Sequence, residues 1–399
     1  MKILLSNKFY YPRGGDCIYT IELQQLLSSK AHDVAIFSMQ HPENLVDKYS
    51  YYWPKNIDYE NSNLSKFYDK LYRPFGTNEV KKKFTNLIKT FNPDIIHLNN
   101  IHSQLSPVLA EIAYKNRIPL VWTLHDYKLL CPSYHFLLNQ RPCELCISNK
   151  INSLVHKCIK NSYPASLLGY AEALIWSRKK LEKYTSIFIS PSNFLKQKMM
   201  DGGFTPGKIN VLPNFFPNDK IIDNNPAKKS FYCYIGRISK EKGIETLLRV
   251  ASQLPDYHLK IIGEGPLLND LKKQFQASHV EFLGFKPWEE ISMILRKSLF
   301  SVIPSEWYEN NPLSAIESLI LGTPILGANI GGIPELIQEN KNGLLFKSGD
   351  EKDLAEKITM MFLLSKKQFN PIVISSEAKN KYSAENYYDQ LIKLYKQIR

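Results

Sequence analysis

The sequence predicts an α/β protein of two domains, each a doubly wound parallel sheet covered by helices. Three observations carry this prediction. A chain of 399 residues is too long for a single hydrophobic core. Short apolar runs alternate with segments of helical periodicity, which is typical of parallel sheets with crossover helices. A segment rich in proline and asparagine, residues 213–226, interrupts the alternation, and the alternation begins again after it.

The first domain is predicted to span residues 1–212. Its short apolar runs predict strands at Lys2 to Ser6, Asp33 to Ser38, Asp94 to Leu98, Leu120 to Leu124, Ser186 to Ser190 and Ile209 to Leu212. The helical patterns between them cover Ile18 to Ser29, Val80 to Phe91, Leu105 to Asn116, Tyr170 to Tyr184 and Asn193 to Met200.

The second domain is predicted to follow a linker at 213–228 and to span 229–375. Its predicted strands are Phe231 to Ile235, His258 to Ile262, Val280 to Leu283, Leu299 to Ile303, Ile325 to Ala328 and Leu344 to Phe346. From Ala378 to Ile398, apolar and aromatic residues recur at helical spacing, which predicts a final amphipathic helix within 376–399.

The net charge of +13 lies mainly in the first half, where residues 1–200 hold 26 Lys and Arg against 15 Asp and Glu. Such an excess suits nucleic acid or an anionic membrane surface. The sequence lacks the zinc-finger, helix-turn-helix and aromatic RNA-binding signatures, so no nucleic-acid partner is expected. Segments 80–91 and 167–184 combine apolar with basic residues. Each is either a membrane-surface helix or an amphipathic helix packed on its own domain.

The chain contains no apolar run of membrane-spanning length and begins without a signal-peptide pattern, so we expect a cytoplasmic protein. In that compartment six cysteines argue against a disulfide framework. Four of them gather in an insertion at about 131–158, with a Cys-x-x-Cys at its centre: Cys131, Cys143, Cys146 and Cys158. They are either ligands of a structural zinc ion or unligated thiols.

The stretch 304–335 carries most of the chemistry. It leads from a strand end through a loop to a predicted helix that begins near Leu313, after Pro312, and stops at Gly322. The free amides of such a helix start suit a phosphate. Glu309 before the helix and Glu317 within it can accept hydrogen bonds from the hydroxyls of one ligand. Phosphates flanked by two hydroxyl-rich rings describe a nucleotide sugar.

This stretch resembles the retaining glycosyltransferases of family 4, which have the GT-B fold, two Rossmann-like domains facing a central cleft. The resemblance rests on the two glutamates, on Gly322-Thr323-Pro324, on the run Gly331 to Glu335 and on the run Asn342 to Phe346. It implies that Glu309 contacts the donor sugar and that Glu317 contacts the ribose. It also implies that the last helix, within 376–399, crosses back to the first domain.

The resemblance extends to the loops that would hold the donor diphosphate and line the cleft. Arg237 and Lys242 match the family positions that clamp the diphosphate. The loop with Gly14 and Gly15 and the strand-end His125 match cleft positions. The resemblance thus implies catalytic roles for His125, Arg237, Lys242 and Glu309, and donor contacts from Gly14, Gly15, Arg237, Lys242, Glu309, Asn310, Asn311, Leu313, Ser314 and Glu317. Further candidates are Asp16, Asp126, Asn193, Gly263 and Phe285.

Three positions depart from the family pattern. Asp16 replaces the usual glutamate and shortens its reach. Asn310-Asn311-Pro312 stands where many relatives have Gly-Phe-Gly, which would reshape the sugar pocket. Phe215 replaces the usual glycine of the linker turn.

The expected activity is a retaining sugar transfer of the EC 2.4 class, from a nucleoside-diphosphate sugar to a hydroxyl of a saccharide or lipid-linked saccharide. We expect it in surface polysaccharide biosynthesis, in the cytoplasm, either free or as a peripheral protein on the inner face of the plasma membrane. The chain lacks an Asp-x-Asp motif, so no metal is expected in catalysis. Two alternatives are a non-catalytic nucleotide-sugar-binding subunit of a polysaccharide-synthesis complex and a soluble disaccharide synthase.

Overall fold

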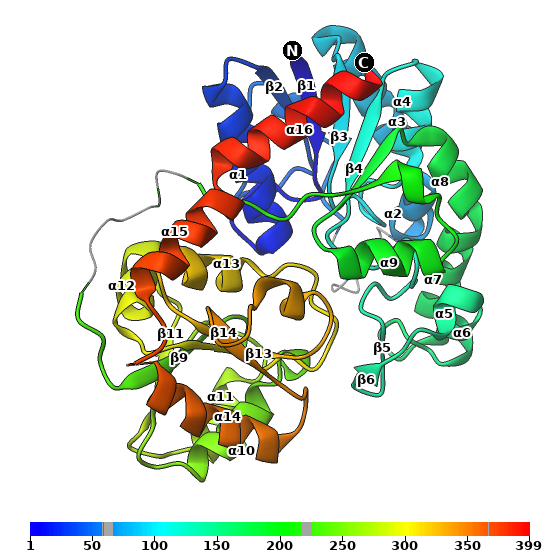
Figure 1. The fold of residues 1–399 in the computed structure, drawn as a ribbon. Helices are drawn as coiled ribbons and strands as arrows, with labels where there is room; N and C mark the ends of the chain where they lie inside the picture. The colour runs from blue at the N-terminus through cyan, green and yellow to red at the C-terminus, as the bar shows by residue number, and fades with distance from the viewer. Residues whose placement is uncertain (58, 60–66, 218–219, 221–225, 366) are drawn as a thin grey trace. The chain divides into compact units, whose positions relative to one another are not determined.

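The computed structural model describes residues 1–57, 59, 67–217, 220, 226–365 and 367–399 (Figure 1). The chain divides into two compact units. Unit 1 contains Met1–Phe136, Cys143–Pro213 and Tyr387–Arg399, and unit 2 contains Leu137–Pro142 and Asn214–Asn386. Within the described residues, no helix is both long and apolar enough to cross a membrane.

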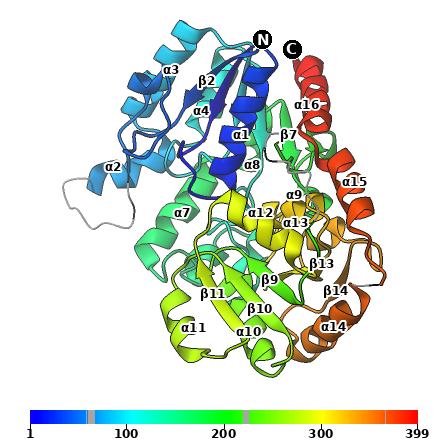
Figure 2. The same ribbon diagram turned by 90° about the vertical axis from the view of Figure 1, so that its left-hand side faces the viewer.

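Unit 1 is built on a six-stranded sheet in which every neighbouring pair is parallel (Figures 1 and 2). Its strand order is β2-β1-β3-β4-β7-β8. The strands are β1 Lys2–Ser6, β2 Asp33–Phe37, β3 Ile95–Leu98, β4 Leu120–Thr123, β7 Ile187–Ser190 and β8 Ile209–Val211. The helices are α1 Gly15–Ser29, α2 Phe67–Tyr72, α3 Asn78–Phe91, α4 Val108–Lys115, α5 Leu145–Ser148, α6 Asn152–Val155, α7 Tyr163–Ile175, α8 Arg178–Tyr184 and α9 Asn193–Asp201.

Unit 2 contains a second six-stranded parallel sheet, in the order β11-β10-β9-β12-β13-β14. Its strands are β9 Phe231–Ile235, β10 His258–Ile262, β11 Val280–Gly284, β12 Ser301–Ile303, β13 Ile325–Ala328 and β14 Gly343–Phe346. Its helices are α10 Ile244–Ser252, α11 Leu268–Gln274, α12 Trp288–Lys297, α13 Leu313–Ile320, α14 Glu351–Leu364 and α15 Pro371–Tyr382, and α16 Ala384–Ile398 begins in it. The predicted fold class, with two parallel-sheet domains, is confirmed.

Both sheets reverse their direction of growth at a defined point. In unit 1 the chain passes from β1 to β2 on one side and then places β3 on the other side of β1. In unit 2 it passes from β9 to β10 and β11, and then places β12 on the other side of β9. The loops at the carboxyl ends of such neighbouring strands diverge and leave room for a ligand. Binding loops are therefore expected after β1 and β3, and after β9 and β12.

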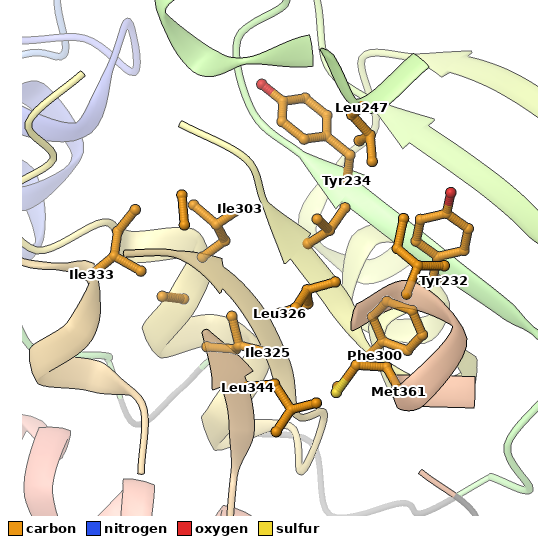
Figure 3. Packing of buried hydrophobic residues seen from close by; sticks show 14 of the residues in the cluster. Tyr232, Tyr234, Leu247, Phe300, Ile303, Ile325, Leu326, Ile333, Leu344 and Met361 are labelled. Carbon is orange, nitrogen blue, oxygen red and sulfur yellow. The ribbon is translucent and has the colours of Figure 1, made fainter. Parts of the chain in front are cut away.

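The core of unit 2 fills the space between its sheet and the covering helices (Figure 3). Tyr232 of β9 stacks on Phe300, with ring centroids 5.1 Å apart, and Met361 of α14 belongs to the same buried cluster. Leu326 of β13 is fully buried. Strands β12 and β13 are buried along their whole length, as parallel strands covered on both faces require.

Two predicted helices are each split in the structure. The pattern at 170–184 belongs to α7 and α8, because Ser177 between them has an extended backbone (φ −59°, ψ 151°). The pattern at 378–398 belongs to α15 and α16, which are separated by Ser383 (φ −63°, ψ 149°). The Ser383 hydroxyl accepts a hydrogen bond from the backbone N–H of Asn386 at 3.3 Å, so this serine caps the start of α16.

Helix α3 does not form the membrane-surface helix that was considered for segment 80–91. Its apolar side chains Val80, Phe84, Leu87, Ile88 and Phe91 are all buried. The lysines between them are exposed or half-buried, which is the pattern of an amphipathic helix packed on its own domain.

Candidate functional site

In unit 2, the loops after β9 and β12 are held against each other. Gly243 has a left-handed backbone (φ +67°), and a Cβ added there would lie 1.8 Å from the carbonyl oxygen of Pro304. Only glycine combines this conformation with so close an approach. The backbone N–H of Glu306 also donates to the carbonyl oxygen of Glu241 at 2.9 Å. These contacts bring together the two loops that contain Lys242 and Glu309.

Glu309 is the centre of this site. One carboxylate oxygen, Oε1, accepts hydrogen bonds from Lys242 Nζ at 2.5 Å, Trp307 Nε1 at 2.8 Å and Ser305 Oγ at 2.9 Å. Burial alone would raise the pKa of Glu309, but the Lys242 ammonium and these donors outweigh it and hold the pKa below its ordinary value. The indole ring of Trp307 also faces the Lys242 ammonium, at 5.1 Å from the ring centroid. The carboxylate is therefore ionised and fixed in place.

Arg237 and Lys242 differ in how they are held. Arg237 is exposed, and its guanidinium has no hydrogen bond or ion pair to the described residues. Lys242 is the last residue of the 3₁₀ turn Lys240–Lys242 and is already paired with Glu309. A phosphate could therefore bind the Arg237 guanidinium directly, whereas it would have to compete with the Glu309 carboxylate for the Lys242 ammonium.

Helix α13 presents its first turn directly after the Glu309 loop. No side chain caps this helix start, and Pro312 is the residue before it. The backbone N–H groups of Leu313 and Ser314 are not used within the helix, because its first hydrogen bonds run from Ala315 and Ile316 to Pro312. Glu317 lies one turn further on and is half-buried. The predicted helix and its free amides are thus present.

Asn311 has a structural role that the sequence did not indicate. Its Oδ1 accepts from the backbone N–H of Asn214, and its carbonyl oxygen accepts from Asn214 Nδ2, both at 2.8 Å. The side chain is 6% exposed, so it is committed to holding the linker. We therefore assign the Asn311 side chain to the linker contact rather than to the sugar pocket, while Asn310 beside it is half-buried.

Several glycines of unit 2 are required by close backbone contacts. At Gly331 (φ +61°) a Cβ would lie 2.4 Å from the carbonyl oxygen of Glu309, and the N–H of Gly332 donates to that same oxygen at 2.6 Å. At Gly263 (φ +134°) a Cβ would collide with the carbonyl oxygen of Gly236 at 2.0 Å. The matched run Gly331 to Glu335 therefore supports the Glu309 loop.

Phe285, another candidate from the sequence, follows β11, and it is 72% exposed.

In unit 1, the residues predicted from the loops after β1 and β4 do meet. His125 Nε2 hydrogen-bonds Asn99 Oδ1 at 3.0 Å, and the ring of Tyr19 meets the imidazole edge-on at 4.8 Å. Burial lowers the pKa of His125 to about 4, although the nearby Asp16 carboxylate opposes this. The Asp16 carboxylate lies 3.8 Å from Lys8 Nζ. His125 is therefore neutral at pH 7.

The Gly14-Gly15 loop is open. Gly14 has an extended backbone (φ −172°), and the nearest atom to an added Cβ would be Asp16 Oδ1 at 3.7 Å. Neither a positive φ nor a close internal contact explains this glycine, and no side chain caps the start of α1. Ser192 caps α9 by accepting from the N–H of Leu195 at 3.1 Å, so local structure accounts for the segment that contains Asn193.

The four clustered cysteines all lie in the described part of the chain. Cys131 Sγ lies 3.1 Å from Ser133 Oγ, and both Cys131 and Cys146 are buried. Among the described residues, however, no group of three or more His, Cys, Asp or Glu side chains is arranged to hold a metal ion. None of the four forms a disulfide, and of the two alternatives the described geometry favours unligated thiols over a structural zinc site.

Some residues of these sites were not singled out from the sequence. Ser305 and Trp307 belong to the stretch 304–335, but only their contacts with Glu309 give them a role. Lys8 lies two residues after β1 and Asn99 directly after β3, so their position near strand ends was a usable signal. Their proximity to Asp16 and His125 depends on tertiary structure.

Comparison with known proteins gives matches over most of the chain. Residues 13–220 match the model of the family described as Glycosyltransferase Family 4, and residues 216–373 match Glycosyl transferases group 1. An uncharacterized 42.6 kDa protein in the cps region of Klebsiella pneumoniae is 25% identical over 414 residues, covering 99% of this chain and all of that protein. An O-antigen biosynthesis glycosyltransferase of Escherichia coli is 31% identical over 217 residues, covering 52% of this chain and 60% of that protein.

Among solved structures, the Anabaena protein HepE in complex with UDP-glucose aligns over the full length of both chains. Its TM-score is 0.69 at 17% identity, a likeness that concerns the fold alone.

Proposed function

Because this chain belongs to glycosyltransferase family 4 and has the GT-B fold, we propose that it transfers a sugar from a nucleoside-diphosphate sugar to a hydroxyl of a saccharide or lipid-linked saccharide during surface polysaccharide synthesis. Members of this family are retaining glycosyltransferases of the EC 2.4 class that use nucleotide-sugar donors. What we propose for this chain is which of its residues bind the donor and catalyse the transfer, and which kind of acceptor it uses.

One observation carries the proposal, namely the contact between Lys242 and Glu309. It brings a cation suited to phosphate and a carboxylate suited to sugar hydroxyls within 2.5 Å of each other, on the two loops that flank the switch point of unit 2. In the proposed donor complex, Arg237 and Lys242 bind the diphosphate together with the free amides of α13. Glu309 then accepts from the sugar hydroxyls, and Glu317 accepts from the ribose.

In the proposed reaction, the bond between the sugar C1 and the leaving diphosphate oxygen breaks while the acceptor oxygen bonds to C1 on the same face. The acceptor proton passes to the leaving phosphate oxygen. Arg237, Lys242 and the helix amides stabilise the negative charge that develops on the diphosphate, which is the task that a divalent cation performs in other transferases. The neutral imidazole of His125 would contribute a hydrogen bond to the reacting sugar rather than a charge.

The acceptor side of the proposal rests on relatives and on the surface of α7. The Escherichia coli relative takes part in O-antigen biosynthesis, and the Klebsiella relative comes from a cps region. In this chain Tyr163, Leu167 and Leu174 share one face of α7 and are 56%, 53% and 54% exposed. The basic residues Arg178 to Lys180 follow at the start of α8. An exposed apolar face next to cations suits the surface of an anionic membrane that carries a lipid-linked acceptor.

The experiment that tests the proposal is turnover of a panel of nucleotide sugars by the purified chain, followed by NMR of the product anomer. The proposal requires release of one nucleoside diphosphate and a product with the same anomeric configuration as the donor. An inverted product, or donor binding with no transfer or hydrolysis under any condition, would overturn it. The second outcome would favour the non-catalytic subunit.

Sedimentation with anionic vesicles separates the membrane-associated transferase from a soluble disaccharide synthase. The membrane form requires co-sedimentation that is lost in the double variant Leu167→Ser, Leu174→Ser.

A further inference from the structure

Unit 1 contains a pocket of about 360 Å³ that no feature of the donor site explains. This volume lies within the range of about 300–1,000 Å³ that is usual for small-molecule sites. Its floor comes from residues after three parallel strands: Lys8 after β1, Asn100 and His102 after β3, and Asp126 after β4. The pocket thus lies at the switch point of the unit 1 sheet, where ligands of such sheets bind.

The walls of the pocket come from elements that the sheet alone would not require. The cysteine-rich insertion 131–158 contributes Tyr134 and His135, whose ring centroids lie 3.7 Å apart. Helix α7 contributes Gly169 and the buried Glu172. Tyr134 remains 46% exposed. Aromatic side chains combined with a few fixed polar groups are typical of pockets that bind an organic ligand.

The charges around the pocket balance. Lys128 Nζ is 2.9 Å from a Glu172 carboxylate oxygen, and both side chains are at most 10% exposed. Lys8 lies beside Asp16, and the Lys160 ammonium donates to the carbonyl oxygen of Tyr59 at 2.8 Å. The three lysines that line the pocket are thus matched by Asp126, Glu172 and the adjacent Asp16. A phosphate or a uronate would find no surplus of positive charge here.

Two polar groups of the pocket are available to a ligand. The imidazole of His102 is 9% exposed and stacks on Trp122, with centroids 5.4 Å apart, but its nitrogens have no hydrogen-bond partner among the described residues. Burial lowers the pKa of His102 well below its ordinary value, so the ring is neutral. Asp126 Oδ1 accepts from the backbone N–H of Lys128 at 2.9 Å, which leaves Oδ2 available. A buried polar group without a partner is costly unless a ligand or water satisfies it.

We propose that this pocket binds the acceptor, and that the part of the acceptor it recognises is an uncharged sugar ring. His102 and Asp126 hydrogen-bond the ring hydroxyls, and Tyr134 packs on the apolar face of the ring. A neutral imidazole and a carboxylate match hydroxyl groups, which both donate and accept, and a carboxylate without excess cations repels an anionic sugar. The inference rests on the proposed function, because it names the substrate class of the same transferase.

The test measures saccharide binding to the full-length chain without donor, by saturation-transfer NMR. The probes are methyl glycosides of glucose, galactose and N-acetylglucosamine, with methyl glucuronide and glycerol 3-phosphate as charged comparisons. We expect at least one uncharged glycoside to bind and both charged probes to bind at least tenfold more weakly. Tighter binding of a charged probe, or binding of no uncharged glycoside, would overturn the inference.

Two conservative variants locate the binding. His102→Phe keeps the ring stacked on Trp122 but removes its nitrogens, and Asp126→Asn keeps an oxygen for the Lys128 N–H but removes the charge. Each variant should lower the affinity for the uncharged glycoside at least tenfold, whereas Lys240→Ala in unit 2 should leave that affinity unchanged. Unaltered affinity in both pocket variants would contradict the assignment. Donor binding, measured separately by thermal shift, should be equal in all four proteins, so failure of the donor site is distinguishable from failure of this pocket.

Discussion

At the scale of single residues, the two main charged groups of the proposed donor site, Lys242 and Glu309, are paired with each other. Lys242 and Glu309 form an ion pair in which the lysine side chain is 24% exposed and the glutamate 9%. Trp307 and Ser305 complete the shell around the same carboxylate oxygen. When the donor binds, the Lys242–Glu309 ion pair would be replaced by a contact between Lys242 and the diphosphate and a contact between Glu309 and the sugar hydroxyls. Neither charged group would then be left buried without a partner.

Lys242→Ala is expected to weaken binding of a nucleoside diphosphate by roughly 10- to 100-fold, the equivalent of about 1.5–3 kcal/mol for a charge-assisted contact. Nucleoside binding should change little, because the base and ribose do not meet this ammonium. Calorimetric titration of both ligands measures the difference. Lys240→Ala is the matched control, since Lys240 is an exposed lysine of the same 3₁₀ turn. Equal losses for nucleoside and diphosphate would argue against the clamp.

Glu309→Gln is expected to lower stability at pH 7 by about 1–3 kcal/mol, because it leaves a partly buried lysine without its counter-charge. The folded-state pKa of Glu309 lies below the ordinary value of 4.5, so the ionised form stabilises the fold above that pH. As the pH falls through the folded pKa, this contribution is lost. The difference in Tm between wild type and variant should therefore narrow below pH 4.5, and a difference independent of pH would be inconsistent with the ion pair.

At the scale of elements, most strands could be predicted because each is a short apolar run between turn residues. The predicted strand His258 to Ile262 is identical to β10, and Leu299 to Ile303 loses only two residues at its start. Helix ends are harder to predict from the sequence. The apolar pattern at 378–398 is continuous, but the extended backbone of Ser383 ends one helix and its hydroxyl caps the next.

For the candidate donor site, too, the sequence predicted the residues but not their contacts. The family resemblance assigned Glu309 and Lys242 to one donor site, but their direct contact and the contacts of Asn311 with Asn214 depend on the tertiary fold.

Gly331→Ala tests whether the glycine-rich run after β13 positions the Glu309 loop. The added methyl would strain a left-handed backbone, at a cost of roughly 1–2 kcal/mol, and would also collide with the backbone of Glu309. Gly349→Ala is the control, because Gly349 has a similar φ of +75° but no atom within 4 Å of an added Cβ. Both variants should lose stability, but only Gly331→Ala should lose donor affinity. If the two variants bound donor equally well, the supporting role of Gly331 would be refuted.

At the scale of the whole molecule, the buried His97 and His102 and the half-buried His125 make the stability of unit 1 dependent on pH. Burial lowers the pKa of His97 to about 3 and that of His125 to about 4, and it lowers the pKa of His102 as well. The unfolded chain binds protons at these histidines near the ordinary value of 6.5. Below pH 6.5 the unfolded state therefore takes up more protons than the folded state, and stability must fall with pH.

In His97→Gln, unfolding is expected to take up one proton fewer at acid pH. The free energy of unfolding should therefore fall less steeply, by about 1.4 kcal/mol per pH unit between pH 6 and 4. At pH 7 the variant should be less stable, because His97 hydrogen-bonds both Tyr395 Oη at 2.6 Å and Thr123 Oγ1 at 2.7 Å. Denaturant unfolding at pH 7 and pH 5 gives both quantities. A variant with the wild-type slope would show that His97 is not the group that titrates on unfolding.

We propose that a nucleotide sugar binds at the paired Lys242 and Glu309 without a metal ion. The most direct test is thermal-shift titration of the full-length chain with UDP-, GDP-, ADP- and dTDP-sugars, with and without a chelator. A ligand that binds only the folded state raises Tm in proportion to its saturation. We predict that one donor class raises Tm, that the chelator does not change the shift, and that Lys242→Ala reduces it. A shift that disappears with the chelator would show that donor binding needs a metal ion, and one that is unchanged in Lys242→Ala would place the donor elsewhere.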